Sequence, residues 1–136
     1  MKKIFAAGLA AALLSAACND PLAPAPPTPV APTITDSFTG NLAVLTTNSH
    51  PFIVNAVGSV FVTLTSVDPA ATLGIGVGTP STTTGTCVPV SSVATAAGTS
   101  PQLKGTATVK GNFCIAVADI GNLVEPVDYT ITVLHP

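Results

Sequence analysis

From Ile34 onward the chain repeats one pattern, an alternation of apolar with small or polar residues at period two. Side chains of a β-strand point alternately to its two faces, so this alternation predicts strands with one buried face. The clearest segments cover residues 58–65, 73–78, 113–118 and 129–134, and weaker ones cover 37–45, 50–57, 86–93 and 102–109. Because no amphipathic helical stretch follows the first 17 residues, the sequence predicts one all-β domain over residues 34–136, an antiparallel β-sandwich of about eight strands.

Residues 1–17 have the composition of a secretory signal peptide. Lys2 and Lys3 precede an apolar run from Ile4 to Leu14, and small residues follow the run. The apolar segment is shorter than the roughly 20 residues that a helix needs to cross a bilayer. We therefore expect this segment to direct export and to be removed, and we expect no transmembrane anchor.

Cys18 directly follows the small residues, and residues 14–18 (Leu-Ser-Ala-Ala-Cys) resemble the lipobox of bacterial lipoproteins. The resemblance implies that Cys18 is acylated and becomes the first residue of an envelope lipoprotein. The resemblance also implies a destination: such lipoproteins stay at the inner membrane when Asp follows the Cys, so Asn19 in that position favours the outer membrane or the cell surface. Ser15 departs from the pattern, which has an aliphatic residue there. The alternative is ordinary cleavage after Ala17, which leaves a free thiol on a periplasmic or secreted protein.

Residues 18–33 form a proline-rich linker, with Pro at positions 21, 24, 26, 27, 29 and 32. Proline at this density holds the backbone near polyproline II, so the linker is predicted to be a semi-rigid tether of about 40 Å. The alternatives are a peptide ligand for a groove, or O-linked sugars on Thr28 and Thr33.

Cys87 and Cys114 are the two cysteines of the expected domain. We expect them to form a disulfide, since disulfides persist in exported domains. Closure of a loop of about 27 residues would stabilise the fold by roughly 3.5 kcal/mol. The alternative, two free or metal-binding thiols, has no Cys-x-x-Cys or His spacing to support it.

Only 7% of the residues are charged. After removal of residues 1–17, the chain keeps two cationic side chains, Lys104 and Lys110, and six carboxylates, which gives a formal charge of −4. A nucleic-acid binder needs a basic surface, and electrostatic binding to anionic lipid needs clustered cations, so both are excluded. Membrane attachment then depends on the lipid at Cys18.

Four stretches resemble the bacterial pre-peptidase C-terminal domain. They are residues 50–54 (His-Pro-Phe-Ile-Val), 58–64 (Gly-Ser-Val-Phe-Val-Thr-Leu), 111–119 (Gly-Asn-Phe-Cys-Ile-Ala-Val-Ala-Asp) and 128–133 (Asp-Tyr-Thr-Ile-Thr-Val). The resemblance spans nearly all of residues 37–134. It implies a jelly-roll-like β-sandwich that serves secreted hydrolases as an accessory module, without catalysis.

The chain departs from that family in two strands. The family often has Asp-Leu-Asp-Leu-Tyr in the central strand, where this chain has residues 71–78 (Ala-Thr-Leu-Gly-Ile-Gly-Val-Gly). The family often has Arg and Tyr on the outer side of the late strand, where this chain has alanines. The ligand chemistry of the acidic strand is therefore not implied, and the outer face is predicted to be smooth.

This smooth face comprises Gly74, Gly76, Gly78, Ala116 and Ala118. Soluble β proteins usually protect their sheets with charged side chains, which are scarce here. We expect the face to contact an envelope protein or another copy of the chain, and a polysaccharide stays open as a partner of the domain. The alternative is a passive monomeric module whose Thr, Ser and Asn residues hydrate the surface.

Catalytic motifs are absent from the sequence. His50 and His135 are the two histidines, and no Gly-x-Ser-x-Gly elbow, His-Glu-x-x-His helix or phosphate loop occurs. We therefore expect no enzyme and no cofactor. The predicted function is a non-catalytic, surface-anchored binding or structural module, with a self-assembling adhesin-like subunit as the alternative.

Two ligand classes stay open. Asp119, Glu125 and Asp128 bracket one loop and make a candidate calcium site, although Asp119 would equally cap the turn before Gly121. Glycan binding usually relies on exposed aromatic platforms, but Trp is absent and the aromatic residues are predicted to lie in the core, with only Phe61 sharing a face with polar residues.

Overall fold

The computed structural model describes residues 23–136, so the predicted signal segment, Cys18 and the start of the predicted linker lie outside the described residues. Each expected segment overlaps one strand. The eight strands are β1 (Ile34–Leu42), β2 (Thr47–Val54), β3 (Gly58–Asp68), β4 (Leu73–Pro80), β5 (Cys87–Thr95), β6 (Leu103–Ala107), β7 (Gly111–Ala118) and β8 (Val127–His135). Within residues 23–136, no helix is long and apolar enough to span a membrane.

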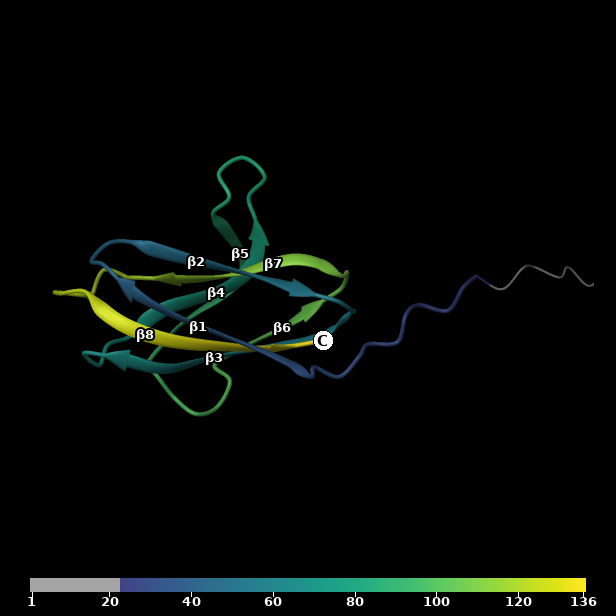
Figure 1. Cartoon of the computed structure of the whole chain (residues 1–136), viewed down its shortest axis with the longest axis horizontal. Helices are drawn as coiled ribbons and strands as arrows, with labels where there is room; N and C mark the ends of the chain where they lie inside the picture. Colours follow the sequence, from purple (N-terminus) through teal and green to yellow (C-terminus); the bar gives the residue numbers. More distant parts are fainter. Residues whose placement is uncertain (1–22) are drawn as a thin grey trace, which may run out of the picture.

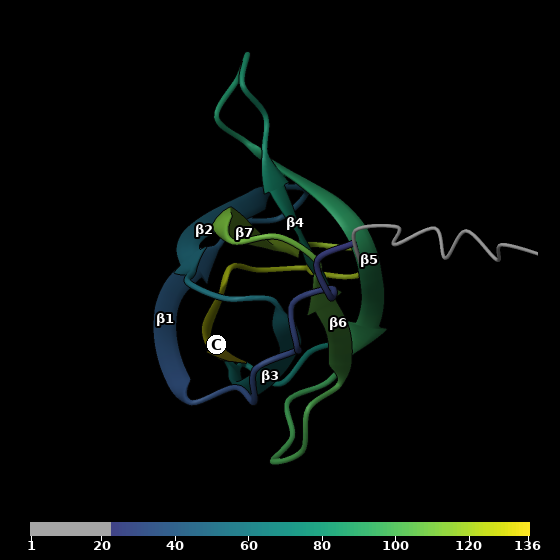
Figure 2. The ribbon, with the colours of Figure 1, turned by 90° about the vertical axis from the view of Figure 1, so that its right-hand side faces the viewer.

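The strands form two antiparallel four-stranded sheets that enclose one core (Figures 1 and 2). Sheet A has the order β1-β8-β3-β6, and sheet B has the order β2-β7-β4-β5. Each strand of the first half pairs with its counterpart in the second: β1 with β8, β2 with β7, β3 with β6 and β4 with β5. A long hairpin rolled up in this way is a jelly roll, so the predicted all-β sandwich is confirmed.

The core lies between the sheets, on the faces that the alternation predicted. Val62 and Leu64 of β3 and Ile131 and Val133 of β8 are all fully buried. Phe61, which directly precedes Val62, is half-buried on the outer face of sheet A. In β3 and β8 the alternation therefore identifies the buried face, as expected for strands with one solvated side.

The linker joins the sandwich before β1 begins. The N–H of Val30 donates to the carbonyl of Val57 at 2.8 Å, and the N–H of Thr33 donates to the carbonyl of His135 at 3.1 Å. A Cβ at position 58 would clash with the carbonyl of Val30, so Gly58 is needed for this approach. The predicted tether is thus bound to the domain from Val30 onward.

The linker and the C-terminal residue lie at one end of the sandwich, which we call the proximal end (Figure 1). The β1–β2, β3–β4 and β7–β8 loops lie at the opposite, distal end. This arrangement follows from the pairing, because the starts of β1 and β3 and the end of β8 all lie at the proximal end. The distal loops are therefore the part of the domain farthest from the linker.

Candidate functional site

The small residues predicted as a contact face do lie together on the outer side of sheet B. Gly76 of β4 is opposite Ala116 of β7, and Gly78 is opposite Cys114. This face is not open, because Gly76, Gly78 and Ala116 are buried. A Cβ on Gly76 would meet the side chain of Pro89 at 2.8 Å. The chain's own β5 therefore covers this surface at Gly76 and Gly78, whereas Gly74 and Ala118 are half-buried.

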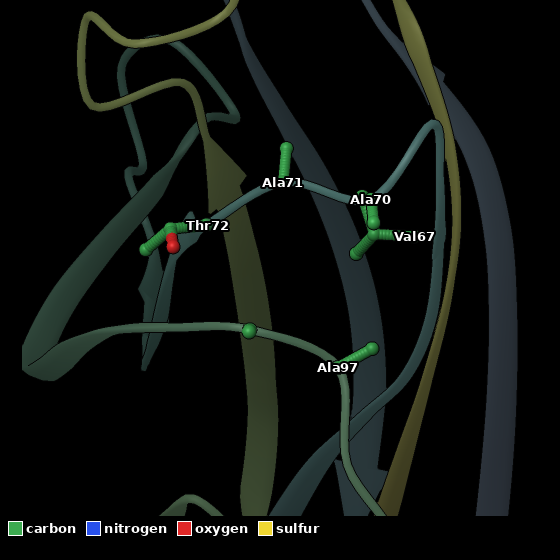
Figure 3. A pocket seen from close by; sticks show the side chains of 6 residues that line it. Val67, Ala70, Ala71, Thr72 and Ala97 are labelled. Atoms are coloured by element: carbon green, nitrogen blue, oxygen red, sulfur yellow. The ribbon is translucent and has the colours of Figure 1, made fainter.

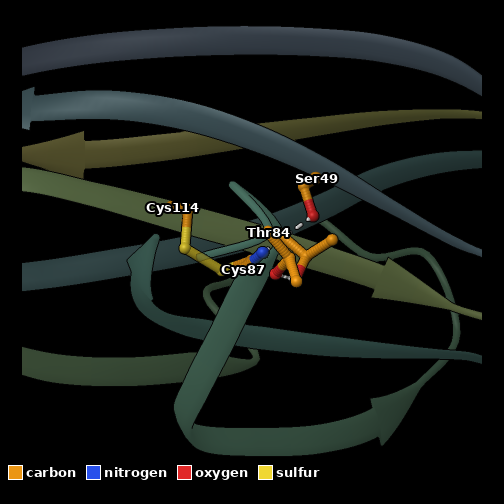
Figure 4. The surroundings of a disulfide bond; sticks show 5 residues. Ser49, Thr84, Cys87 and Cys114 are labelled. Carbon is orange, nitrogen blue, oxygen red and sulfur yellow. Dashed lines mark hydrogen bonds between the residues drawn. A yellow bond between two sulfur atoms is a disulfide. The ribbon is translucent and has the colours of Figure 1, made fainter. Parts of the chain in front are cut away.

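A disulfide holds this covering strand in place. Cys87 at the start of β5 is bonded to Cys114 of β7, with the two Cα atoms 5.6 Å apart (Figure 4). The N–H of Cys87 also donates to Oγ of Ser49 on β2 at 3.1 Å. The predicted disulfide is confirmed, and it ties β5 to a strand that is not its neighbour in sheet B.

Asp119 serves as a cap for the β7–β8 loop. Its Oδ1 accepts the N–H groups of residues 121–123, and its Oδ2 accepts the N–H of Leu45 at 2.8 Å. The bond from Leu45, followed by those from the loop, holds the pKa of Asp119 below its usual value. Among residues 23–136, no three His, Cys, Asp or Glu side chains gather where they would hold a metal ion. The structure thus leaves Asp119, Glu125 and Asp128 without a shared ligand position.

A polar cluster lines the seam where β1 and β2 meet. Nε2 of His50 lies 2.6 Å from Oη of Tyr129, to which Nδ2 of Asn48 donates at 3.1 Å. The ring of Phe38 stacks on His50 with the ring centroids 5.0 Å apart. Burial lowers the pKa of His50 and raises that of Tyr129, the latter offset in part by the hydrogen bond from Asn48.

His135 lies farther along the same seam and is 1% exposed. Its Nε2 is 3.0 Å from Oδ2 of Asp36, and its ring packs 5.1 Å from that of Phe52. The hydrogen bonds of the two imidazoles, within the described part of the chain, include no Ser, Thr or Cys side chain. Neither histidine thus forms the nucleophile–base pair that acyl-transfer enzymes use.

Four exposed apolar side chains lie on two of the distal loops. Val44 and Leu45 of the β1–β2 loop are 36% and 79% exposed, and Ile120 and Val124 of the β7–β8 loop are 51% and 93% exposed. We call these four the distal apolar residues. Asp119 links the two loops, since it accepts the N–H of Leu45 and donates its own N–H to the carbonyl of Thr46 at 3.0 Å.

Charge is divided between the two ends. Four of the five carboxylates in residues 23–136 lie at or next to the distal ends of strands: Asp68, Asp119, Glu125 and Asp128. Lys110 lies in the proximal β6–β7 turn, and Lys104 lies on β6 with its Nζ 5.8 Å from the ring centroid of Phe61. The distal end is therefore acidic as well as apolar.

The β3–β4 loop separates two hollows at the distal end. One hollow, of about 310 Å³, is bordered by Val67, Thr72 and Ala97 (Figure 3). The other, of about 200 Å³, is bordered by Val124 and Glu125. Ala70 and Ala71 of this loop border both hollows, so the distal surface is uneven.

No family model matches the chain, and no curated protein matches it. The chain's own features that bear on function are the distal loops, the proximal linker and the N-terminal segment before residue 23. Sequence reasoning missed the distal apolar residues, although apolar side chains between two strand patterns are a readable signal of this kind.

Proposed function

We propose that the chain is a non-catalytic lipoprotein of the bacterial cell envelope, anchored through Cys18 at the outer membrane or cell surface. Its β-sandwich binds a partner with the distal end. The observation that carries the proposal is the polarity of the domain: the linker docks at the proximal end through Val30 and Thr33, while the distal apolar residues and four of the five side-chain carboxylates of residues 23–136 lie at the other.

The resemblance to the pre-peptidase C-terminal domain supports an accessory role. The jelly-roll strand order agrees with the fold that this resemblance implies. The likeness to the lipobox and the signal-like residues 1–17 support export and acylation. We therefore propose an accessory module that acts beside other envelope proteins.

The intact mass of the protein purified from a bacterial envelope tests the anchor. We expect a chain that begins at Cys18 and carries the added mass of its lipid, and we expect Cys18→Ala to lose that mass and the membrane fraction. Thr28→Ala in the same linker is the matched control and leaves both unchanged. An unmodified mass for the envelope-purified protein would contradict the proposal.

A self-assembling, adhesin-like subunit is the second candidate, and one strand supports it. β5 is an edge strand of sheet B, and its nine residues include no charged side chain. Charged side chains normally prevent edge-to-edge pairing. Pro89 and the register shift at Val77/Gly78 interrupt the first half of this edge, which leaves residues 91–95 for pairing.

Sedimentation of the purified protein at high concentration tests this candidate. Self-assembly predicts larger species that Ser92→Lys removes and that Thr83→Lys, in the exposed β4–β5 loop, retains. Ala116 is only 5% exposed, so a lysine there would disrupt the fold rather than report on assembly. A monomer at every concentration would exclude the candidate.

A further inference from the structure

The distal apolar residues are costly to expose on an isolated molecule. Leu45 has a φ of 59°, in the left-handed region that bulky residues rarely adopt. The bond from its N–H to Oδ2 of Asp119 holds the loop in this conformation, with the Leu45 side chain 79% exposed. Val124 is 93% exposed on the neighbouring loop. Two loops tied by one carboxylate thus present apolar side chains to solvent.

The carboxylates at this end have no cation beside them within the described residues. Among the described residues, the ion pair that forms joins His135 to Asp36, and it lies near the proximal end. Lys104 of β6 pairs with Phe61 of β3. Phe61 precedes Asp68 by seven residues on the same strand, which separates Lys104 from Asp68 by about 23 Å at about 3.3 Å per residue. Salt screens charges beyond about 8 Å at physiological ionic strength. The distal end therefore presents an acidic field around its apolar side chains.

We propose that the distal end docks a protein surface in which lysine or arginine side chains surround an apolar depression. Leu45 and Val124 would fill the depression, and Asp68 and Glu125 would face the cations at its rim. The proposal rests on the proposed function, which directs this end away from the anchor.

The carboxylates at the distal end indicate which kind of molecule binds there. An anionic membrane would be repelled by the distal carboxylates, and so would the distal end of a second copy. The proximal end of a second copy carries Lys110, but the linker bound at Val30 and Thr33 occupies that end. A cationic protein surface is the occupant that matches both the apolar and the acidic side chains.

Binding to immobilised peptides tests the proposal with the mature protein purified from the envelope in neutral detergent. The probes are a leucine–lysine peptide, a serine–lysine peptide and a leucine–glutamate peptide. We expect the first to bind at least tenfold more tightly than the other two. We also expect its affinity to fall at least tenfold between low and high salt.

Variants locate the binding surface. The double variant Leu45→Asn/Val124→Ser should lose at least tenfold in affinity for the leucine–lysine peptide, and Asn tolerates the backbone conformation at position 45. The matched control is Val88→Ser/Val90→Ser on β5, where the valines are 52% and 81% exposed. We expect the control to bind within twofold of the wild type. All proteins are measured in the same detergent, so binding of the peptide to the micelle contributes equally to each affinity.

Three results would overturn the proposal. Equal binding of the serine–lysine peptide would show that charge alone acts. Binding to phosphatidylcholine vesicles that Leu45→Asn/Val124→Ser abolishes would identify a membrane as the occupant. Self-association abolished by the same variant would identify a second copy.

Failure of docking and failure of the proposed anchor are read separately. Acylated protein that does not bind the leucine–lysine peptide overturns docking alone. Protein that binds the peptide but has no lipid on Cys18 overturns the anchor alone.

Discussion

Removal of the Cys87–Cys114 disulfide should destabilise the domain by about 3.5 kcal/mol. The bond closes a loop of 27 residues, and its loss returns that loop's entropy to the unfolded chain. In the folded state β5 also loses its covalent tie to β7, which holds its first residues close to Gly76 and Gly78. A cost of this size is a large part of the about 5–15 kcal/mol that holds a domain folded.

Urea unfolding followed by far-ultraviolet circular dichroism measures this change. For an m-value of about 2 kcal/mol/M, the midpoint of Cys87→Ala/Cys114→Ala should fall by about 1.7 M. A reducing agent should lower the wild-type midpoint by a similar amount and leave the double variant unchanged. A change below about 1 kcal/mol, with the wild-type disulfide verified by mass, would refute the argument from loop entropy.

Three further perturbations test other contacts. Gly40→Ala should lower the free energy of unfolding by about 2 kcal/mol, because the new Cβ would lie 2.5 Å from Oη of Tyr129. Gly105→Ala is the control: its new Cβ would have its nearest contact at 3.6 Å, so stability in the same urea assay should change by less than about 0.5 kcal/mol. His50 has a lowered pKa in the folded state, so the unfolded chain binds the proton more readily; stability should fall as pH drops below about 6.5, and His50→Asn should weaken that dependence in unfolding curves taken from pH 8 to pH 5. Asp119 also has a lowered folded pKa, so its contribution is present above the unfolded value and is lost as pH falls through the folded one; thermal unfolding should show Asp119→Asn less stable than the wild type at pH 7, and the two should converge in strong acid.

The strands and their buried faces were predictable because alternation depends only on local sequence. Val62 and Leu64 lie inward and Thr63 lies outward, as the period-two pattern of β3 requires. The disulfide was also predictable, since export and the count of cysteines leave one pair. These features need no knowledge of which strands are neighbours.

The polar seam was not predictable, because it depends on register between distant strands. His50 and Tyr129 are 79 residues apart and meet only once β2 and β8 take their places in opposite sheets. His135 is similar: its position next to the last residue gives no sign that it is buried against Asp36.

The small residues of sheet B indicated that another segment packs closely on this face, but they did not indicate which segment. Gly76 and Gly78 do receive a packed neighbour, yet this neighbour is Pro89 or Val88 of the chain's own β5. The register shift beside Gly78 that accompanies this packing has no marker in the local alternation. Asp119 was more readable, because an Asp two residues before a Gly is typical of a turn.

Photocrosslinking in the native envelope tests most directly whether the distal end is the binding surface. p-Benzoyl-phenylalanine in place of Val124 samples the distal end, and the same group in place of Val88 samples the exposed face of β5. The proposed function predicts a discrete adduct from position 124, lost on Leu45→Asn, and none from position 88. An adduct from position 88 with none from position 124 would contradict it.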